Sequence, residues 1–318
     1  MCLRSFFLAG GLLLALPTLA QRQQLTVAAD GSGDFKTVQA AFDAVPEGNT
    51  SPITITIKKG VYKEKLTLAA GKNEVHLVGT DATQTVLTFD DYNQRIDPNT
   101  GKNIGTSGSG SIHIYGNGFS ARNITFENSA GPVGQAVAAW VSGDRASFVD
   151  CRFLGFQDTL YTFGFGSRQY YKKCYIEGTV DFIFGSSTAW FEDCTIFGKR
   201  GGFFTAASTP DTTRYGYVFK NCKLTGDAPA GSFFLGRPWR PYAKTVFLDC
   251  SLGALVKPEG WDEWGKESNK QTSYYAEYQS AGPGAAPKSR VAWSHQLTAQ
   301  EAKQYTRDQV LRGWQPGK

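Results

Sequence analysis

Charged residues, histidines and long apolar runs are all scarce in this 318-residue sequence. Only 19% of the residues are Asp, Glu, Lys or Arg, while 14% are aromatic and 36 are glycine, which is typical of an ordered, turn-rich protein and excludes a disordered chain. Lys and Arg form no basic run, and no zinc-finger spacing occurs, so we expect no nucleic-acid partner. The formal net charge of +5 suits export or an acidic substrate without selecting either.

The usual sequence signatures of hydrolases and metalloenzymes are also absent. No G-x-S-x-G occurs, and His76, His113 and His295 have neither metal-ligand nor triad spacing. His76 and His113 lie in strand-like segments, where we expect structural roles. The sequence therefore predicts no metal site and no cofactor.

The longest apolar stretch lies at the N-terminus. Residues 1–20 combine Arg4, an apolar segment and small residues ending at Ala20, which predicts a secretory signal peptide. Pro17 interrupts this segment, which is too short for a membrane anchor. No other segment is long and apolar enough to cross a bilayer, so we expect a secreted, extracellular protein with no membrane partner. Residues 21–318 show no second unit and are predicted to form a single, monomeric domain.

Five cysteines mark an internal repeat. The segments FVDCRF, YKKCYI, FEDCTI, FKNCKL and FLDCSL are centred on Cys151, Cys174, Cys194, Cys222 and Cys250, and FSARNITF places Ile124 at the same position one repeat earlier. Each cysteine follows an aromatic residue by three positions and precedes an apolar residue by two. A period in the twenties with one short strand per unit indicates a solenoid. Because Gly, Asn and Asp separate the strands and leucine-rich spacing is absent, we predict an all-β, right-handed single-stranded parallel β-helix.

The repeat places equivalent residues on neighbouring turns about 4.8 Å apart. The cysteines should therefore form a ladder of buried side chains, in which core packing and disulfide formation both remain open. The odd number leaves at least one thiol free unless it pairs between molecules. At the ends of the coil we predict a capping helix over Asp34 to Val45 and a C-terminal helix in LTAQEAKQYTRDQVL, which opens with Thr298 and Glu301 in capping-box spacing.

The same period brings polar residues together. Gln135 and Gln157 are one repeat apart in the sequence, and so are Asp158 and Asp181, so one turn separates the members of each pair. Arg237 follows Asp181 by the length of two of the longer turns. We therefore expect these five side chains in one patch.

Such a patch has the chemistry of a catalytic site. Two carboxylates at one-strand spacing titrate as a unit, so one proton is held to higher pH. A nearby arginine keeps the other carboxylate charged. The set then offers a nucleophile, a general acid, two amide donors for an oxyanion and, in Trp239, a platform on which a sugar can stack.

The blocks GQAVAAW, GFQDTLY, GTVDFIFG and LGRPWR resemble, in order and spacing, the signatures of the pectinesterase (pectin methylesterase) family. The flanking segments DGSGDFKTVQAA and YYAEYQSAGPGA also match, so the resemblance spans roughly Leu25 to Pro316. It implies a secreted parallel β-helix enzyme that removes methyl esters from pectin (homogalacturonan). The lack of a long preceding inhibitory region favours a microbial-type member, and the resemblance leaves room for a proteinaceous inhibitor as partner.

Carried over residue by residue, the resemblance makes Asp181 the nucleophile and Asp158 the general acid and base. Gln135 and Gln157 would form the oxyanion hole, and Arg237 would orient Asp181. The residues implied to line the sugar groove are Trp239, Tyr161, Phe184, Val180, Thr106 and Trp140. The resemblance also points to a disulfide between Cys174 and Cys194, the pair with the shortest spacing, and leaves the fate of Cys151, Cys222 and Cys250 open.

Three other functions compete with esterase activity. A pectin-active lyase normally gathers acidic residues around calcium, and no such cluster occurs at the repeat spacing. A glycoside hydrolase could use the Asp158 and Asp181 pair, although it has no need of two oxyanion-binding glutamines. A non-catalytic polysaccharide-binding β-helix could use the same groove, and its function would survive the loss of Asp181.

Overall fold

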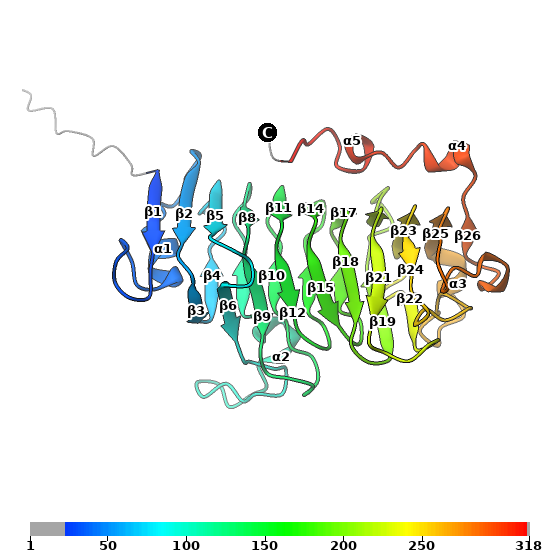
Figure 1. The fold of residues 1–318 in the computed structure, drawn as a ribbon, viewed down its shortest axis with the longest axis horizontal. Helices are drawn as coiled ribbons and strands as arrows, with labels where there is room; N and C mark the ends of the chain where they lie inside the picture. Colours follow the sequence, from blue (N-terminus) through cyan, green and yellow to red (C-terminus); the bar gives the residue numbers. More distant parts are fainter. Residues whose placement is uncertain (1–22, 317–318) are drawn as a thin grey trace, which may run out of the picture.

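The computed structural model describes residues 23–316, which form a parallel β-helix (Figure 1). The predicted signal peptide, residues 1–20, lies outside the described residues. Along the chain, strands pass in turn through three parallel sheets, so each sheet gains about one strand per turn of the coil. This confirms the predicted parallel β-helix.

The first sheet runs the whole length of the coil. Its eleven strands within residues 23–316 are β1 (Gln24–Val27), β2 (Ile53–Ile57), β5 (Val75–Gly79), β8 (Ser120–Arg122), β11 (Ala146–Val149), β14 (Arg168–Lys172), β17 (Thr188–Glu192), β20 (Tyr217–Lys220), β23 (Lys244–Leu248), β25 (Tyr274–Tyr278) and β26 (His295–Gln296).

The second sheet follows the first after a short turn. Its eight strands in the described chain are β3 (Gly60–Lys63), β6 (Thr85–Phe89), β9 (Thr125–Asn128), β12 (Arg152–Leu154), β15 (Tyr175–Gly178), β18 (Thr195–Gly198), β21 (Lys223–Gly226) and β24 (Ser251–Leu252).

The third sheet carries the polar patch at its edge. Its seven strands in the same part of the chain are β4 (Leu66–Leu68), β7 (Ile112–Ile114), β10 (Ala139–Val141), β13 (Leu160–Thr162), β16 (Ile183–Gly185), β19 (Gly202–Ala207) and β22 (Phe233–Gly236).

The turn from the first sheet to the second depends on one residue in the left-handed backbone region. That residue precedes the repeated cysteine or isoleucine, and its φ lies between 51° and 57° on six successive turns: Asn123, Asp150, Lys173, Asp193, Asn221 and Asp249. Asn and Asp tolerate this conformation better than most residues. The recurring Asn or Asp before the cysteine therefore has a conformational cause.

The aromatic residues of the repeat form a stack inside the coil. The ring centroids of Phe148 and Tyr171 are 5.0 Å apart, those of Tyr171 and Phe191 are 4.7 Å apart, and the stack continues through Phe219 to Phe247 at 4.4 and 4.6 Å. All five side chains are fully buried. The sequence period thus becomes a continuous core, in which each turn packs on its neighbours.

The cysteines form the predicted ladder, but Cys174 and Cys194 are free thiols, as are the other three within residues 23–316. The predicted disulfide is therefore absent from this structure. Equivalent Cβ atoms on in-register parallel strands lie about 4.8 Å apart and point the same way, whereas a disulfide brings its Cβ atoms to about 3.5–4.5 Å. Each thiol instead donates to carbonyl oxygens, that of Cys174 to Phe148 at 3.4 Å and that of Cys194 to Tyr171 at 3.5 Å.

Short helices flank the coil. Helix α1 (Val38–Ala44), capped by the Thr37 hydroxyl, buries Phe42 at the N-terminal end, as predicted, although it begins later than expected. The predicted C-terminal helix is two helices, because a second capping box, Thr306 with Gln309, follows the first. The remaining helices in the described chain are α2 (Gly105–Gly108), α3 (Asn269–Thr272), η1 (Pro287–Ser289), α4 (Ala299–Ala302) and α5 (Arg307–Val310).

The C-terminal segment that carries α4 and α5 runs back along the outside of the first sheet (Figure 1). Among residues 23–316, no helix is both long enough and apolar enough to cross a membrane.

Candidate active site

The predicted polar residues meet in one cleft of about 380 Å³ beside the third sheet. Nine of the predicted site residues line it: Thr106, Gln135, Gln157, Asp158, Tyr161, Asp181, Phe184, Arg237 and Trp239. They come from segments that are far apart in the chain, and the parallel register of the coil brings them together.

The two aspartates lie side by side because their strands are in register. Leu160 of β13 pairs with Ile183 of β16, two residues beyond Asp158 and Asp181, and the amide of Asp158 donates to the carbonyl of Val180 at 3.1 Å. Both aspartates have left-handed backbones, with φ of 64° and 55°. The two aspartates, which the sequence places one repeat apart, therefore lie at equivalent positions on two adjacent, hydrogen-bonded turns.

Asp181 is held by a two-point ion pair. The Nε of Arg237 donates to Oδ1 of Asp181 at 2.9 Å, and Nη2 donates to Oδ2 at 2.7 Å. The guanidinium itself is sandwiched between the rings of Phe203 and Trp264, whose centroids lie 3.8 and 3.7 Å from Cζ. A planar, fixed fork is the geometry in which arginine orients a carboxylate most strongly.

The two aspartates differ in their tendency to hold a proton. Asp158 is 3% exposed, and burial together with the charge of Asp181 raises its pKa well above the usual value, although a hydrogen bond from Gln135 and the charge of Arg237 oppose this. Burial also raises the pKa of Asp181, but hydrogen bonding and charge from Arg237 act against the rise. The proton shared by the pair therefore resides on Asp158, which leaves Asp181 as the carboxylate.

The glutamines come from adjacent turns. Gln135 and Gln157 form a parallel bridge, and the amide of Ala136 donates to the carbonyl of Gln157 at 3.1 Å. Both side chains line the cleft beside Asp158. Neutral amide donors next to a charged carboxylate can stabilise negative charge that develops on a substrate oxygen.

An aromatic wall extends from the aspartates. Tyr161 stacks on Phe184 with centroids 4.2 Å apart, and Trp239 meets both rings edge-on at 6.0 and 5.8 Å. Mainly because of burial, the pKa of Tyr161 is raised to about 12, so it stays a neutral phenol. Apolar rings beside polar groups form a surface on which a sugar ring can stack.

Two predicted groove residues do not line this cleft. Trp140 of β10 is in register with Tyr161 and continues the aromatic row one turn away, with its ring centroid 4.7 Å from that of Tyr161, and Val180 meets the site through its backbone carbonyl. Three lining residues were not predicted: Ser107, Ala206 and Trp264. Trp264 lies in the segment GWDEWGKES, between repeat strands, where the period gives no position for it.

No group of three or more His, Cys, Asp or Glu side chains within residues 23–316 is arranged to hold a metal ion.

The sequence and the fold match those of known proteins. A family model described as Pectinesterase matches residues 24–314. Pectinesterase 31 of Arabidopsis thaliana is 42% identical over 289 residues, which cover 89% of this chain and 90% of that protein. A probable pectinesterase/pectinesterase inhibitor of Brassica napus is 40% identical over 88% of this chain, which spans about half of that longer protein (49%).

Among solved structures, a pectin methylesterase in complex with hexasaccharide VII superposes with a TM-score of 0.82 at 34% identity, covering 92% of this chain and 98% of that one. The two named relatives are plant proteins, and the expectation of a microbial-type enzyme stays a prediction. Because the family model covers nearly all of the described residues, the chain belongs to the pectinesterase family, whose members hydrolyse the carboxylic esters of pectin.

Proposed function

We propose that this pectinesterase removes methyl groups from galacturonate units of homogalacturonan through a covalent intermediate on Asp181. The observation that carries this mechanism is that one of the two neighbouring aspartates is charged and the other is protonated. Asp181 is fixed by the Arg237 fork, while Asp158 is buried, forms no ion pair among residues 23–316, and holds the proton. One residue is thus a nucleophile and the other an acid before substrate arrives.

In the first half of the reaction, an oxygen of Asp181 attacks the carbonyl carbon of the methyl ester. The carbonyl oxygen becomes an oxyanion, which accepts hydrogen bonds from the side-chain amides of Gln135 and Gln157. When the oxyanion collapses, the bond to the methoxy group breaks and Asp158 gives its proton to the leaving oxygen. Methanol departs, and the sugar remains joined to Asp181 as an anhydride.

In the second half, Asp158 is a carboxylate and accepts a proton from an incoming water molecule. The resulting hydroxide adds to the anhydride carbonyl, and the same amides stabilise the second oxyanion. Its collapse releases the sugar carboxylic acid and returns Asp181 as a carboxylate beside Arg237. Asp158 has regained its proton, so the site is ready for another turnover.

The aromatic wall supports this substrate assignment. Tyr161, Phe184 and Trp239 present stacked and edge-on rings next to the aspartates, where a galacturonate ring would lie with its ester over Asp181. Thr106 of α2 also lines the cleft and would contact the same polysaccharide chain.

Methanol release from highly methylated pectin, with polymer length followed in parallel, tests this function. We expect methanol without a change in chain length, and no release from Asp181→Asn, whose side chain keeps the shape but loses the nucleophile. Chain shortening would indicate a glycoside hydrolase, and ultraviolet-absorbing unsaturated products would indicate a lyase. Pectin binding without methanol would indicate a non-catalytic binding protein.

We also propose that the protein is secreted after cleavage at Ala20 and acts as a monomer. The N-terminal sequence of the exported protein tests the cleavage, and sedimentation tests the monomer. A proteinaceous inhibitor remains a proposed partner, which titration of activity with a purified pectinesterase inhibitor domain would reveal.

A further inference from the structure

The catalytic role of Gln135 depends on which end of its amide faces the cleft. The NH₂ end stabilises an oxyanion, whereas the oxygen end would repel it. The bridge to Gln157 fixes the backbone of Gln135, but it does not choose between two amide orientations that have nearly the same shape. Some other contact must make that choice.

Asn93 provides such a contact. Its Nδ2 donates to Oε1 of Gln135 at 3.0 Å, and its backbone amide donates to the carbonyl of Gln135 at 2.9 Å. The oxygen end of the Gln135 amide is therefore engaged away from the reaction. The NH₂ end is left to bond the carboxyl group of Asp158 and, in the reaction, the oxyanion.

The orientation of Asn93 is itself determined by this pair. Its Oδ1 is buried and has no hydrogen-bond partner among the described residues. If the amide were turned over, Oδ1 would face Oε1 of Gln135, and two acceptors would meet without a proton between them. The contact therefore couples the two amides, and the hydrogen bond from Gln135 to the carboxyl group of Asp158 favours this orientation of the pair over the one in which both amides are turned over.

Asn93 belongs to residues 90–111, which we call the arm, an excursion between β6 and β7 that projects from one edge of the coil and carries α2 (Figure 1). The carbonyl of Asn93 accepts a hydrogen bond from Gly105 at 2.9 Å, one residue before Thr106 of the cleft. The arm therefore reaches the active site at two points.

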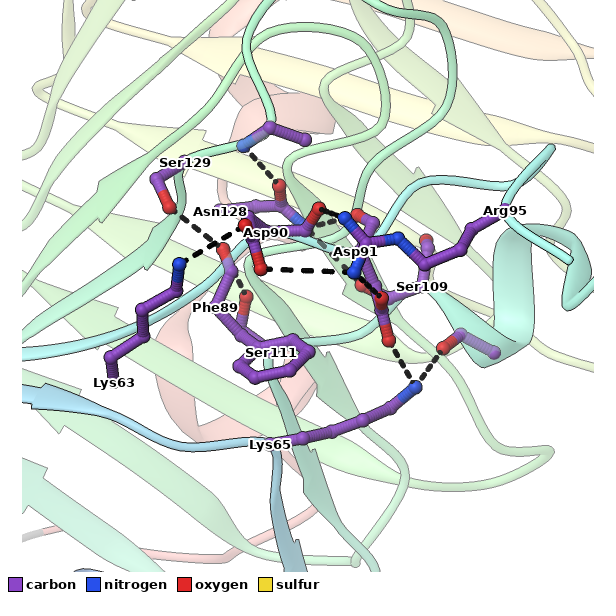
Figure 2. A network of polar contacts seen from close by, with 12 residues as sticks. Lys63, Lys65, Phe89, Asp90, Asp91, Arg95, Ser109, Ser111, Asn128 and Ser129 are labelled. Atoms are coloured by element: carbon purple, nitrogen blue, oxygen red, sulfur yellow. Dashed lines mark hydrogen bonds and ion pairs between the residues drawn. The ribbon is translucent and has the colours of Figure 1, made fainter. Parts of the chain in front are cut away.

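A polar network fastens the base of the arm to the coil (Figure 2). Asp91, 5% exposed, pairs with Lys65 at 2.5 Å and with Arg95 at 2.9 Å. The amide of the buried Asn128 donates to the carbonyls of Asp91 and Ser109 at 2.9 and 3.1 Å. These contacts hold both ends of the arm, so Asn93 meets Gln135 at a fixed position.

We infer that Asn93 is a positioning residue, which orients the amide of Gln135 so that its NH₂ group faces the oxyanion. This inference rests on the proposed function. Asn93 touches neither the substrate nor the reacting atoms in this scheme, and it acts only through Gln135.

Kinetics of two variants separate positioning from structural support. Asn93→Ala should lower kcat about 5- to 30-fold with KM within about twofold, because the lost hydrogen bond matters mainly in the transition state. Asn93→Asp keeps the shape but presents only acceptors, so it should lose at least as much. Asn99→Ala, at an exposed site on the arm, is the matched control and should match wild type.

A double-mutant cycle shows whether Asn93 affects kcat through Gln135. In a Gln135→Ala background, Asn93→Ala should cost less than about twofold in kcat, because the group that it positions is gone. A loss that stays 5- to 30-fold there, or an Asn93→Asp enzyme as active as wild type, overturns the inference. Thermal midpoints of all variants show whether the fold is intact. If wild-type protein releases no methanol, the proposed function fails instead, and with it the basis of this inference.

Discussion

Replacement of Arg237 by alanine tests whether Asp181 is the charged nucleophile and Asp158 the proton donor. In Arg237→Ala, Asp181, which is 6% exposed in the wild-type structure, loses both hydrogen bonds of the fork and its neighbouring positive charge. Breaking one side of a buried ion pair costs about 3–5 kcal/mol. If most of that cost falls on keeping Asp181 ionised before it attacks, kcat falls roughly 10²- to 10³-fold at neutral pH.

The same change should alter the pH profile of kcat/KM in a defined direction. Asp181 must be ionised to attack, so its titration sets the acid limb, on which activity rises with pH. Arg237 lowers the pKa of Asp181, and without it that pKa rises. The acid limb should therefore move to higher pH, and part of the lost activity should return as pH increases.

Arg237→Lys refines the test, because lysine keeps the charge but has neither the fork nor the planar stacking between Phe203 and Trp264. We expect an acid limb near that of wild type with a kcat lowered about tenfold, since the charge sets the pKa and the fork sets the orientation. Arg122→Ala, an exposed arginine on the first sheet, controls for net charge. An acid limb that does not move in Arg237→Ala would refute the assignment of Asp181 as the ionised nucleophile.

Four further changes test the geometry. Asp158→Asn should slow methanol release severely, least for esters with better leaving groups, and should remove the alkaline limb of kcat/KM. Because folding raises the pKa of Asp158, its contribution to stability is lost as pH rises through the folded pKa, so the same variant should melt at higher temperature than wild type near pH 8. Gln157→Ala should cost roughly 10²–10³ in kcat with little change in KM, as measured by initial rates. Phe191→Ala, within the fully buried aromatic stack, should lower the free energy of unfolding by about 3–5 kcal/mol in denaturant titrations. Enzyme treated with EDTA and desalted should keep its rate, and activity restored only by calcium would favour a lyase.

The period of the sequence predicted the fold and most of the site because a parallel coil converts sequence spacing into contact. The spacing of one repeat between Asp158 and Asp181 becomes a pair on adjacent strands, and the aromatic residue three positions before each cysteine becomes the internal stack. The same argument placed Arg237 two turns beyond Asp181, where the fork forms.

The site residues that the sequence did not predict lie in segments that are not part of the repeat. Asn93 is on the arm between β6 and β7, and Trp264 is in the segment between β24 and β25. Neither position has an equivalent on the next turn, so no spacing relates it to the site. Trp264 nevertheless stacks on Arg237, and Asn93 bonds to Gln135.

The cysteines show a different limit. The short spacing between Cys174 and Cys194 correctly implied neighbouring positions, and in this structure both are free thiols that donate to carbonyl oxygens. Sequence spacing places the two side chains on adjacent turns without deciding whether a bridge forms, so the disulfide stays a prediction. Burial raises the pKa of the neighbouring Cys151 to about 12, which keeps it a thiol and slows its oxidation.

The backbone of the catalytic aspartates decides which substitutions can test their chemistry. Asp158 and Asp181 have φ of 64° and 55°, a region that Asp and Asn adopt with little strain and alanine adopts at a cost of roughly 1–2 kcal/mol. An alanine variant at either position would therefore combine the loss of a carboxylate with backbone strain at that position. Asparagine removes the charge while it keeps the backbone and the shape, so the loss of activity in Asp181→Asn reports the loss of the carboxylate and its ion pair with Arg237, without added backbone strain. Where Asp181→Ala loses thermal stability that Asp181→Asn retains, the difference measures the strain.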